Sequence, residues 1–346
     1  MPSKNDFWNS LETTNSLATK TKLIDETTSR ISSKTYNDWR DDLFKDGFVV
    51  VKGVLKKCKA KEYKEEMFKY LSEFSNNEFD INNRDTWTQE ILPVHHPMNL
   101  YHYYSCNHEK FVWDIRSEKQ VIDTFAQIWG TTELLVSFDG FNVTFPNRKD
   151  VPRQRGWPHV DQSPHKRGMQ CVQGIVNLSH SGENDGGLVV YKNSHLLFER
   201  FFDEVVPKER WNDFDFFSIS ETELQWFLDN GCEEIKVNAE EGDIILWDSR
   251  TVHWGKEPEP SSTEIRSLVY VCYTPSIFAT EDSLKAKKVA FEEYLPTTHW
   301  PHDNIIATRN TPLLQNGNVD PRNRNEPLRK PILSDVILKS AGIKPY

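Results

Sequence analysis

The chain of 346 residues carries 42 Lys and Arg against 52 Asp and Glu, a formal net charge of −10. An acidic chain of this kind does not neutralise phosphates, so we expect no nucleic-acid partner. No apolar run reaches the roughly 20 residues that cross a bilayer, and no secretory apolar stretch precedes residue 33, so we expect no membrane partner. Aromatic residues make up 12% of the chain, which excludes global disorder.

The cysteines are odd in number, scattered and without Cys-x-x-Cys spacing. This usage is typical of reduced thiols in a reducing compartment, so a cytoplasmic location is expected. The five residues are Cys58, Cys106, Cys171, Cys232 and Cys272.

The N-terminal part of the chain predicts helices around one strand. Residues 1–35 are polar and are interpreted as an extension, in part helical. Apolar spacing predicts a helix over 36–46 that stops at Gly47, followed by a strand over 48–51. Two further helices are expected over 58–74 and 118–129.

From about residue 134 to 275, short β-branched and aromatic runs alternate with turn-forming residues. This texture is typical of an all-β sandwich or barrel. The sequence therefore predicts a single β core flanked by helices. Strands are expected over 134–137, 141–145, 171–178, 188–191, 234–237, 244–247 and 265–273, and helices over 221–230 and 283–294.

The triplet His159-Val160-Asp161 differs from the other histidine positions of the chain. In a strand, residues i and i+2 point to the same face, so His159 and Asp161 can chelate one ion from one side. His253 follows a predicted strand and can complete a triad. Two imidazoles and one carboxylate leave three coordination positions open, a set that suits non-haem Fe(II) oxygenases. Zinc is the alternative, although no obvious fourth ligand is present.

Arg266 lies inside the apolar run 265–271. A cation embedded in such a strand is costly unless it meets an anion. One interpretation is a solvent-facing side chain on an alternating strand. The other is a guanidinium that grips a carboxylate with two hydrogen bonds. A co-substrate with a carboxylate at one end and a metal chelate at the other would use both features.

Four segments follow one another in the order 43–54, 156–163, 186–195 and 242–253, and Arg266 comes after them. Together they resemble the phytanoyl-CoA dioxygenase-like family, and the stretch 297–301 near the end of the chain resembles a fungal-type branch of it. The resemblance implies a mainly β fold, a double-stranded β-helix (a jelly roll, cupin-like) flanked by N-terminal and C-terminal helices. It implies a dioxygenase domain over 36–278, with 279–346 as an extension packed on the core.

By the same resemblance, His159, Asp161 and His253 match iron ligands, and Arg266 matches the residue that binds the distal carboxylate of 2-oxoglutarate. Thr251 and Asn142 fall where contacts to this co-substrate often lie. The resemblance implies an enzyme that uses Fe(II), 2-oxoglutarate and O2 to hydroxylate an unactivated C–H bond of a small molecule, with release of succinate and CO2. A catalytically silent jelly-roll binding protein and a zinc-dependent cupin-like enzyme remain as alternatives.

Other polar and aromatic groups have two interpretations each. His195 is expected to be structural, and His165 either lines the substrate mouth or is a solvated loop residue. The stretch 95–104 is either a substrate lid or a loop packed on the helices. Trp157 and Trp254 are expected to form pocket walls. A basic cluster either attracts an acidic substrate or is a solvated face, and its members are Arg153, Arg155, Lys166 and Arg167.

Overall fold

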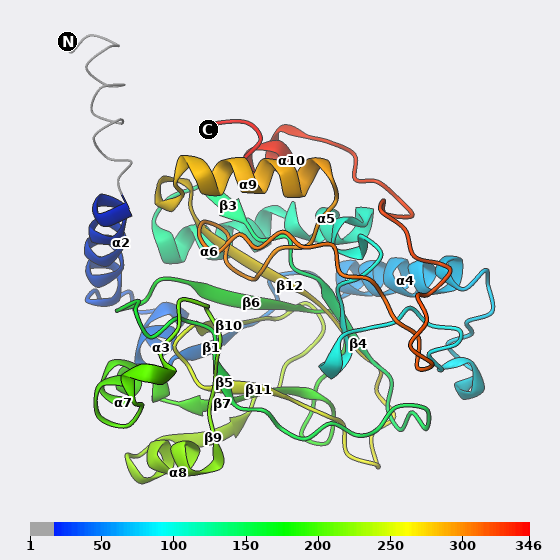
Figure 1. Ribbon diagram of the computed structural model, residues 1–346, viewed down its shortest axis with the longest axis horizontal. Helices are drawn as coiled ribbons and strands as arrows, with labels where there is room; N and C mark the ends of the chain where they lie inside the picture. The colour runs from blue at the N-terminus through cyan, green and yellow to red at the C-terminus, as the bar shows by residue number, and fades with distance from the viewer. Residues whose placement is uncertain (1–16) are drawn as a thin grey trace.

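The computed structural model describes residues 17–346 (Figure 1). The expected N-terminal extension over 1–35 therefore lies partly outside the described residues, and its second half forms helix α2 (Leu17–Ser32). In the described part of the chain, no helix combines the length and the apolarity that crossing a membrane requires.

Two antiparallel sheets form the core of the molecule. In the first sheet, the strand order is β1-β10-β6-β12-β4-β2, and β3 also pairs with β12. Its strands are β1 (Phe48–Val51), β2 (Leu100–Tyr101), β3 (Leu134–Val136), β4 (Phe141–Thr144), β6 (Val172–Asn177), β10 (Ile244–Asp248) and β12 (Arg266–Pro275). In the second sheet, the order is β8-β5-β11-β7-β9. Its strands are β5 (His159–Val160), β7 (Gly187–Lys192), β8 (Phe217–Ser218), β9 (Glu233–Lys236) and β11 (His253–Lys256).

The chain passes repeatedly from one sheet to the other, as it does in a jelly roll. Apolar side chains from both sheets meet in the space between them. Ile175 and Ile245 of the first sheet belong to the same buried cluster as Leu188 and Val190 of the second. The predicted β core is therefore present as two packed layers.

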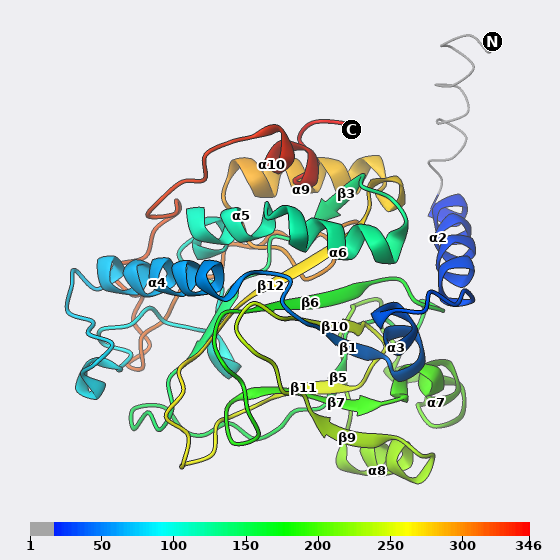
Figure 2. The ribbon, with the colours of Figure 1, turned by 180° about the vertical axis from the view of Figure 1, so that it is seen from behind.

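The outer face of the first sheet is also apolar, because helices cover it. Figure 2 shows α4, α5, α6 and α9 together on that side, with α7 and α8 beyond the second sheet. Because both faces of this sheet are covered, every residue of β6 and β10 and nearly every residue of β12 is buried. The remaining helices are α3 (Trp39–Asp46), α4 (Lys57–Phe74), α5 (Lys110–Arg116), α6 (Lys119–Trp129), α7 (Phe198–Glu204), α8 (Glu221–Asp229), α9 (Glu281–Glu292) and α10 (Asp335–Ser340).

The expectation of a mainly β fold needs correction, because more described residues lie in helices than in strands. The predicted helices all form, within three residues of their expected ends. These helices and α2 already hold more residues than the strands, and α5, α7 and α10, which the sequence did not predict, add to the excess. In α5 nearly every side chain is buried, so the 3.6-residue alternation that marks an amphipathic helix is missing.

Helix α3 ends where the sequence predicted, at Gly47. This residue has φ 85°, and its N–H donates to the Leu43 carbonyl. A side chain here would be strained and would also meet His195, since an added Cβ would lie 2.5 Å from its Nδ1. The turn sends the chain directly into β1, at the edge of the first sheet next to β10.

Candidate metal centre

Three side chains that the sequence singled out meet at one end of the second sheet. His159 on β5 and His253 on β11 are direct partners in the strand pairing, and Asp161 follows β5. The His159 Nε2 lies 3.6 Å from Asp161 Oδ1, and the His253 Nε2 lies 3.2 Å from Asp161 Oδ2. Each residue offers one ligand atom, and these atoms all lie within 4.8 Å of one another. The geometry suits a single metal ion.

Neighbouring groups fix the tautomers of both imidazoles. The Nδ1 of His159 lies 3.0 Å from the Trp157 carbonyl oxygen, and the Nδ1 of His253 lies 2.9 Å from that of Thr251. A carbonyl oxygen only accepts, so each Nδ1 carries the proton and each Nε2 keeps its lone pair for a metal. The Gln173 amide donates to Asp161 Oδ2 at 2.9 Å and orients the carboxylate.

The electrostatics of the site also suit metal ligation. Burial raises the pKa of Asp161, but His299 and His159 outweigh it, so that the pKa lies well below the usual range. Burial, together with the nearby His159, lowers the pKa of His253. Metal ligands must be a charged carboxylate and neutral imidazoles, and these shifts favour both forms. Within residues 17–346 no fourth His, Cys or carboxylate joins the group, which fits an open iron site better than a closed structural zinc site.

Arg266 is the buried first residue of β12, with 6% of its surface exposed. It hydrogen-bonds to Tyr270, and none of the carboxylates in the described chain lies within 4.0 Å of it. Arg250 differs, since it pairs with Asp248 at 2.7 Å and Glu199 at 3.5 Å. A buried guanidinium without a carboxylate partner is costly, so Arg266 is prepared for an anion from outside the chain.

Asn142 and Arg266 share a hydrogen-bond partner, Tyr270. Asn142 pairs with Leu268 of β12, and it hydrogen-bonds to Tyr270 and Thr144. Alternation along β12 places Arg266, Leu268 and Tyr270 on one face, and Leu268 belongs to the cluster between the sheets.

Thr251 is placed differently from Asn142. Its hydroxyl is fully buried and donates to the Gly47 carbonyl at 2.9 Å, so in this structure it anchors the N-terminal segment.

The C-terminal segment reaches the metal site, which the sequence did not indicate. The Trp300 indole N–H donates to the Asp161 carbonyl at 3.0 Å, and His299 Nε2 lies 3.3 Å from the same oxygen. Trp300 is fully buried. The stretch 297–301 attracted notice only as a family resemblance, because no local period links it to a residue 139 positions earlier.

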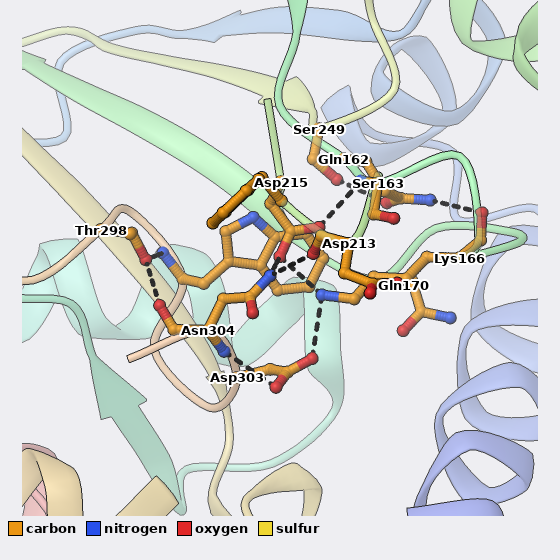
Figure 3. A network of polar contacts seen from close by, with 12 residues as sticks. Gln162, Ser163, Lys166, Gln170, Asp213, Asp215, Ser249, Thr298, Asp303 and Asn304 are labelled. Atoms are coloured by element: carbon orange, nitrogen blue, oxygen red, sulfur yellow. Dashed lines mark hydrogen bonds and ion pairs between the residues drawn. The ribbon is translucent and has the colours of Figure 1, made fainter. Parts of the chain in front are cut away.

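A polar network ties this segment to two loops (Figure 3). The Lys166 ammonium lies 2.6 Å from Asp215 and 2.9 Å from Asp303, and 3.7 Å from the centroid of the Trp300 ring. Asn304 also donates to Asp215. One half-buried cation, Lys166, thus joins the loop after Asp161, the loop before β8 and the C-terminal segment.

Most of the remaining candidates have structural roles. His195 is buried with Nε2 3.1 Å from the Phe44 carbonyl, as the structural interpretation expected. Tyr101 and Tyr104 are buried in the main core, so the stretch 95–104 packs on the helices and is not a lid. His165 is exposed near Asp213, at 3.9 Å.

The two tryptophans that were expected to form pocket walls, Trp157 and Trp254, lie on different sides of the second sheet. The Trp157 ring stacks on His159, with centroids 4.1 Å apart and planes at 5°. Trp254 follows His253 by one residue, so it faces the other side of β11 and packs against the outer aromatic cluster of α7 and α8. Trp157 therefore borders the site as expected, and Trp254 does not.

The expected basic cluster is largely neutralised by ion pairs. Arg153 pairs with Glu259 at 3.2 Å, and Arg167 pairs with Asp203 at 2.9 Å. Lys166 pairs with the two aspartates of the network described above. Three of the four cations are thus engaged, which favours the solvated face over an anion-binding patch.

A buried His-Asp-His triad on one sheet of a jelly roll, with a buried arginine lacking a carboxylate partner on the other, defines the class: a mononuclear metalloenzyme with open coordination positions. The family profile described as "Phytanoyl-CoA dioxygenase (PhyH)" matches residues 43–258. The chain belongs to this family, and it is an enzyme of the oxidoreductase class. The resemblance seen in the sequence motifs is confirmed.

The chain is similar to a relative from a fungus and to two solved structures. "Ava biosynthesis cluster protein O" of Aspergillus versicolor is 41% identical over 272 residues, covering 77% of this chain and 87% of the relative. The carbocyclase SnoK, described as non-heme and alpha-ketoglutarate dependent, is 14% identical with TM-score 0.46, covering 70% of this chain and 85% of its own. EctD from S. alaskensis, solved with 2-oxoglutarate and 5-hydroxyectoine, is 14% identical with TM-score 0.47, covering 72% and 82%.

Proposed function

We propose that the chain is an Fe(II)- and 2-oxoglutarate-dependent dioxygenase that hydroxylates an unactivated C–H bond of a small molecule. Residues 36–278 form the catalytic domain, and 279–346 form an extension packed on it. The observation that carries the proposal is the triad His159, Asp161 and His253, with both Nε2 atoms and the carboxylate directed at one point. The family membership of the chain supports the same activity.

Each part of the site has a role in this proposal. His159, Asp161 and His253 would hold Fe(II), and the bound iron would supply the oxidising chemistry that uses O2 and 2-oxoglutarate and releases succinate and CO2. Arg266 would bind the distal carboxylate of 2-oxoglutarate; Tyr270 hydrogen-bonds to Arg266, and Asn142 hydrogen-bonds to Tyr270. Gln173 keeps the Asp161 carboxylate oriented toward the metal.

The first experiment is an anaerobic titration of the purified protein with Fe(II) and then 2-oxoglutarate. We expect the visible charge-transfer band of the chelate. The band should vanish in His159→Ala and weaken in Arg266→Ala. No band in folded, metal-loaded protein would contradict the proposal. Activity with zinc, without oxygen and without dependence on Arg266, would favour a zinc enzyme instead.

The second experiment separates an enzyme from a silent scaffold. Asp161→Ala removes the only carboxylate of the triad, so we expect it to abolish iron-supported turnover of 2-oxoglutarate, measured as succinate release. Asp203→Ala is the matched control, since this carboxylate pairs with Arg167 on the surface. Turnover near the wild-type rate in Asp161→Ala would contradict the assignment of Asp161 as a metal ligand.

A further inference from the structure

Three of the Trp and Phe side chains in the described residues are exposed, and they lie in two segments beside the metal site. Trp157 is 37% exposed, Phe216 is 41% exposed and Phe214 is 64% exposed. Every other Trp and Phe of the described residues is buried or half-buried. The first segment leads into β5, and the second leads into β8, which pairs with β5. We call Trp157, Phe214 and Phe216 the aromatic ledge.

The geometry of the ledge connects it to the metal ligand. Trp157 stacks on His159 with nearly parallel planes, and the Phe216 ring lies 5.2 Å from His159 and 5.8 Å from Trp157. The three rings therefore form one group in which only His159 is buried. In a protein that otherwise hides its Trp and Phe side chains, an exposed apolar group of this size marks a binding surface.

Most of the positive charge around the ledge is compensated within the chain. Arg153 on the loop before β5, and Lys166 and Arg167 on the loop after it, are each paired with a carboxylate of the chain. Arg155, two residues before Trp157, is exposed and is the member of this cluster without an ion pair among the described residues. Lys166 is also covered by the Trp300 ring. The three paired cations are thus already neutralised, and a phosphate or a carboxylate would have to compete with Glu259, Asp215 and Asp203 for them.

We propose that the aromatic ledge binds a planar, uncharged aromatic part of the substrate and holds it beside the metal. The inference rests on the proposed function, because it assigns the substrate class of the same site. Flat rings stack on Trp and Phe faces, whereas saturated rings of the same size gain only apolar contact. The ledge is on the metal side of β5, so a stacked substrate lies next to the coordination positions that the triad leaves open.

The test compares 2-naphthol with its saturated analogue decahydro-2-naphthol. Binding of each is measured by calorimetry or ligand-observed NMR to the full chain, with and without Fe(II) and 2-oxoglutarate under anaerobic conditions. We expect 2-naphthol to bind at least about fivefold more tightly than the saturated analogue. Trp157→Ala should remove this preference, and Trp157→Phe should restore part of it. The matched control is Ile332→Ala, which truncates a side chain that is 74% exposed far along the chain.

Equal binding of the two alcohols, or a preference for 2-naphthol that survives in Trp157→Ala, would overturn the proposal that the aromatic ledge binds an aromatic ring. Tighter binding of 2-naphthyl phosphate than of 2-naphthol would assign the site to acidic substrates and would overturn it as well. The charge-transfer band recorded on the same metal-loaded samples reports separately on the proposed function. A band without an aromatic preference refutes only the ledge, and an aromatic preference without a band refutes only the oxygenase.

Discussion

Individual neighbours set the chemistry of each functional side chain. His159 and His253 become metal ligands because backbone carbonyls hold their Nδ1 protons. Arg266 and Arg250 are both buried arginines, yet only Arg250 has carboxylates of the chain beside it. One or two contacts thus separate the ion-paired Arg250 from Arg266, which we propose as the residue that binds the anion.

Arg266→Ala should raise the apparent KM for 2-oxoglutarate much more than Arg250→Ala does. Losing a charge-assisted hydrogen bond to a carboxylate costs about 1.5–3 kcal/mol, which corresponds to roughly a 10- to 150-fold rise in KM. Succinate release at varied 2-oxoglutarate measures both variants, and thermal unfolding checks that both fold. The reverse ranking would mean that Arg250 is the anion-binding residue.

Trp300→Phe should weaken iron binding while the protein stays folded. The variant keeps most of the buried ring but removes the N–H that donates to the Asp161 carbonyl, so the segment that carries this ligand loses a support. We expect the Fe(II) dissociation constant to rise about tenfold, the lower end of the range for supporting hydrogen bonds. Trp113→Phe is the matched control, because its indole N–H bonds to His108 in the helical layer. Equal iron affinity in Trp300→Phe and the wild type would contradict a positioning role.

Strand pairing and helix packing act at the scale of elements. Antiparallel pairing of β5 with β11 places His159 opposite His253, so two ligands 94 positions apart in the sequence become neighbours. Alternation along β12 sends Arg266 and Tyr270 to the inner face. Helix α9 packs on the outer layer so closely that Lys287 on it is fully buried.

Lys287 gives the protein a pH-dependent stability. Burial lowers its pKa to about 7, and its ammonium donates to the Val136 carbonyl at 2.6 Å. Between about pH 7 and the ordinary pKa of 10.5, the unfolded chain binds the proton and the native state does not. The contribution of this residue to the free energy of unfolding therefore rises with pH in this window. Below pH 7, the native state carries the full destabilisation that comes from burying a charged ammonium.

Lys287→Met should accordingly stabilise the protein more at pH 6 than at pH 9. One pKa unit corresponds to about 1.4 kcal/mol and the titration spans the two pH units from 7 to 9, so the gain in unfolding free energy should differ by about 3 kcal/mol between the two pH values. Urea unfolding of the wild type and the variant at both pH values measures this difference. A gain that does not change with pH would show that Lys287 is not the titrating group.

At the scale of the whole molecule, the catalytic jelly roll is not independent of the C-terminal extension. Residues of that extension, including Ala290, Leu295 and Ile337, belong to the main core cluster. Trp300 joins Cys171 and Cys272 in a small buried cluster close to the metal site. Residues that follow β12 in the chain therefore cover part of this last core strand, and α5 and α6 cover another part of it.

Truncation after Phe278 should abolish cooperative folding. It removes α9, α10 and Trp300, and the apolar surface it exposes exceeds what a marginal stability of about 5–15 kcal/mol tolerates. Near-ultraviolet circular dichroism and thermal unfolding measure the loss. Truncation after Gly342 is the control and should keep a cooperative transition. A stable, iron-binding fragment 1–278 would show that the extension is dispensable.

The sequence by itself determined the local elements and the metal triad. The β-branched and aromatic runs, with the turn residues between them, indicated most strands, and helical spacing ended by Gly47 and Gly130 indicated the amphipathic helices. His159 and Asp161 were found because i and i+2 share a face, and Arg266 was found because a cation in an apolar strand needs an anion. Each of these inferences uses neighbours within a few residues.

Only the tertiary structure decided the surroundings of that triad. Gln173 hydrogen-bonds to Asp161 from the other sheet, and Trp300 hydrogen-bonds to it from the C-terminal segment, 139 positions along the chain. Thr251 bonds to the Gly47 carbonyl. The sequence did not predict α5, because most of its side chains are buried and it lacks a clear polar face. Contacts between residues more than a hundred positions apart depend on how the sheets and helices pack, and no periodicity along the chain encodes them.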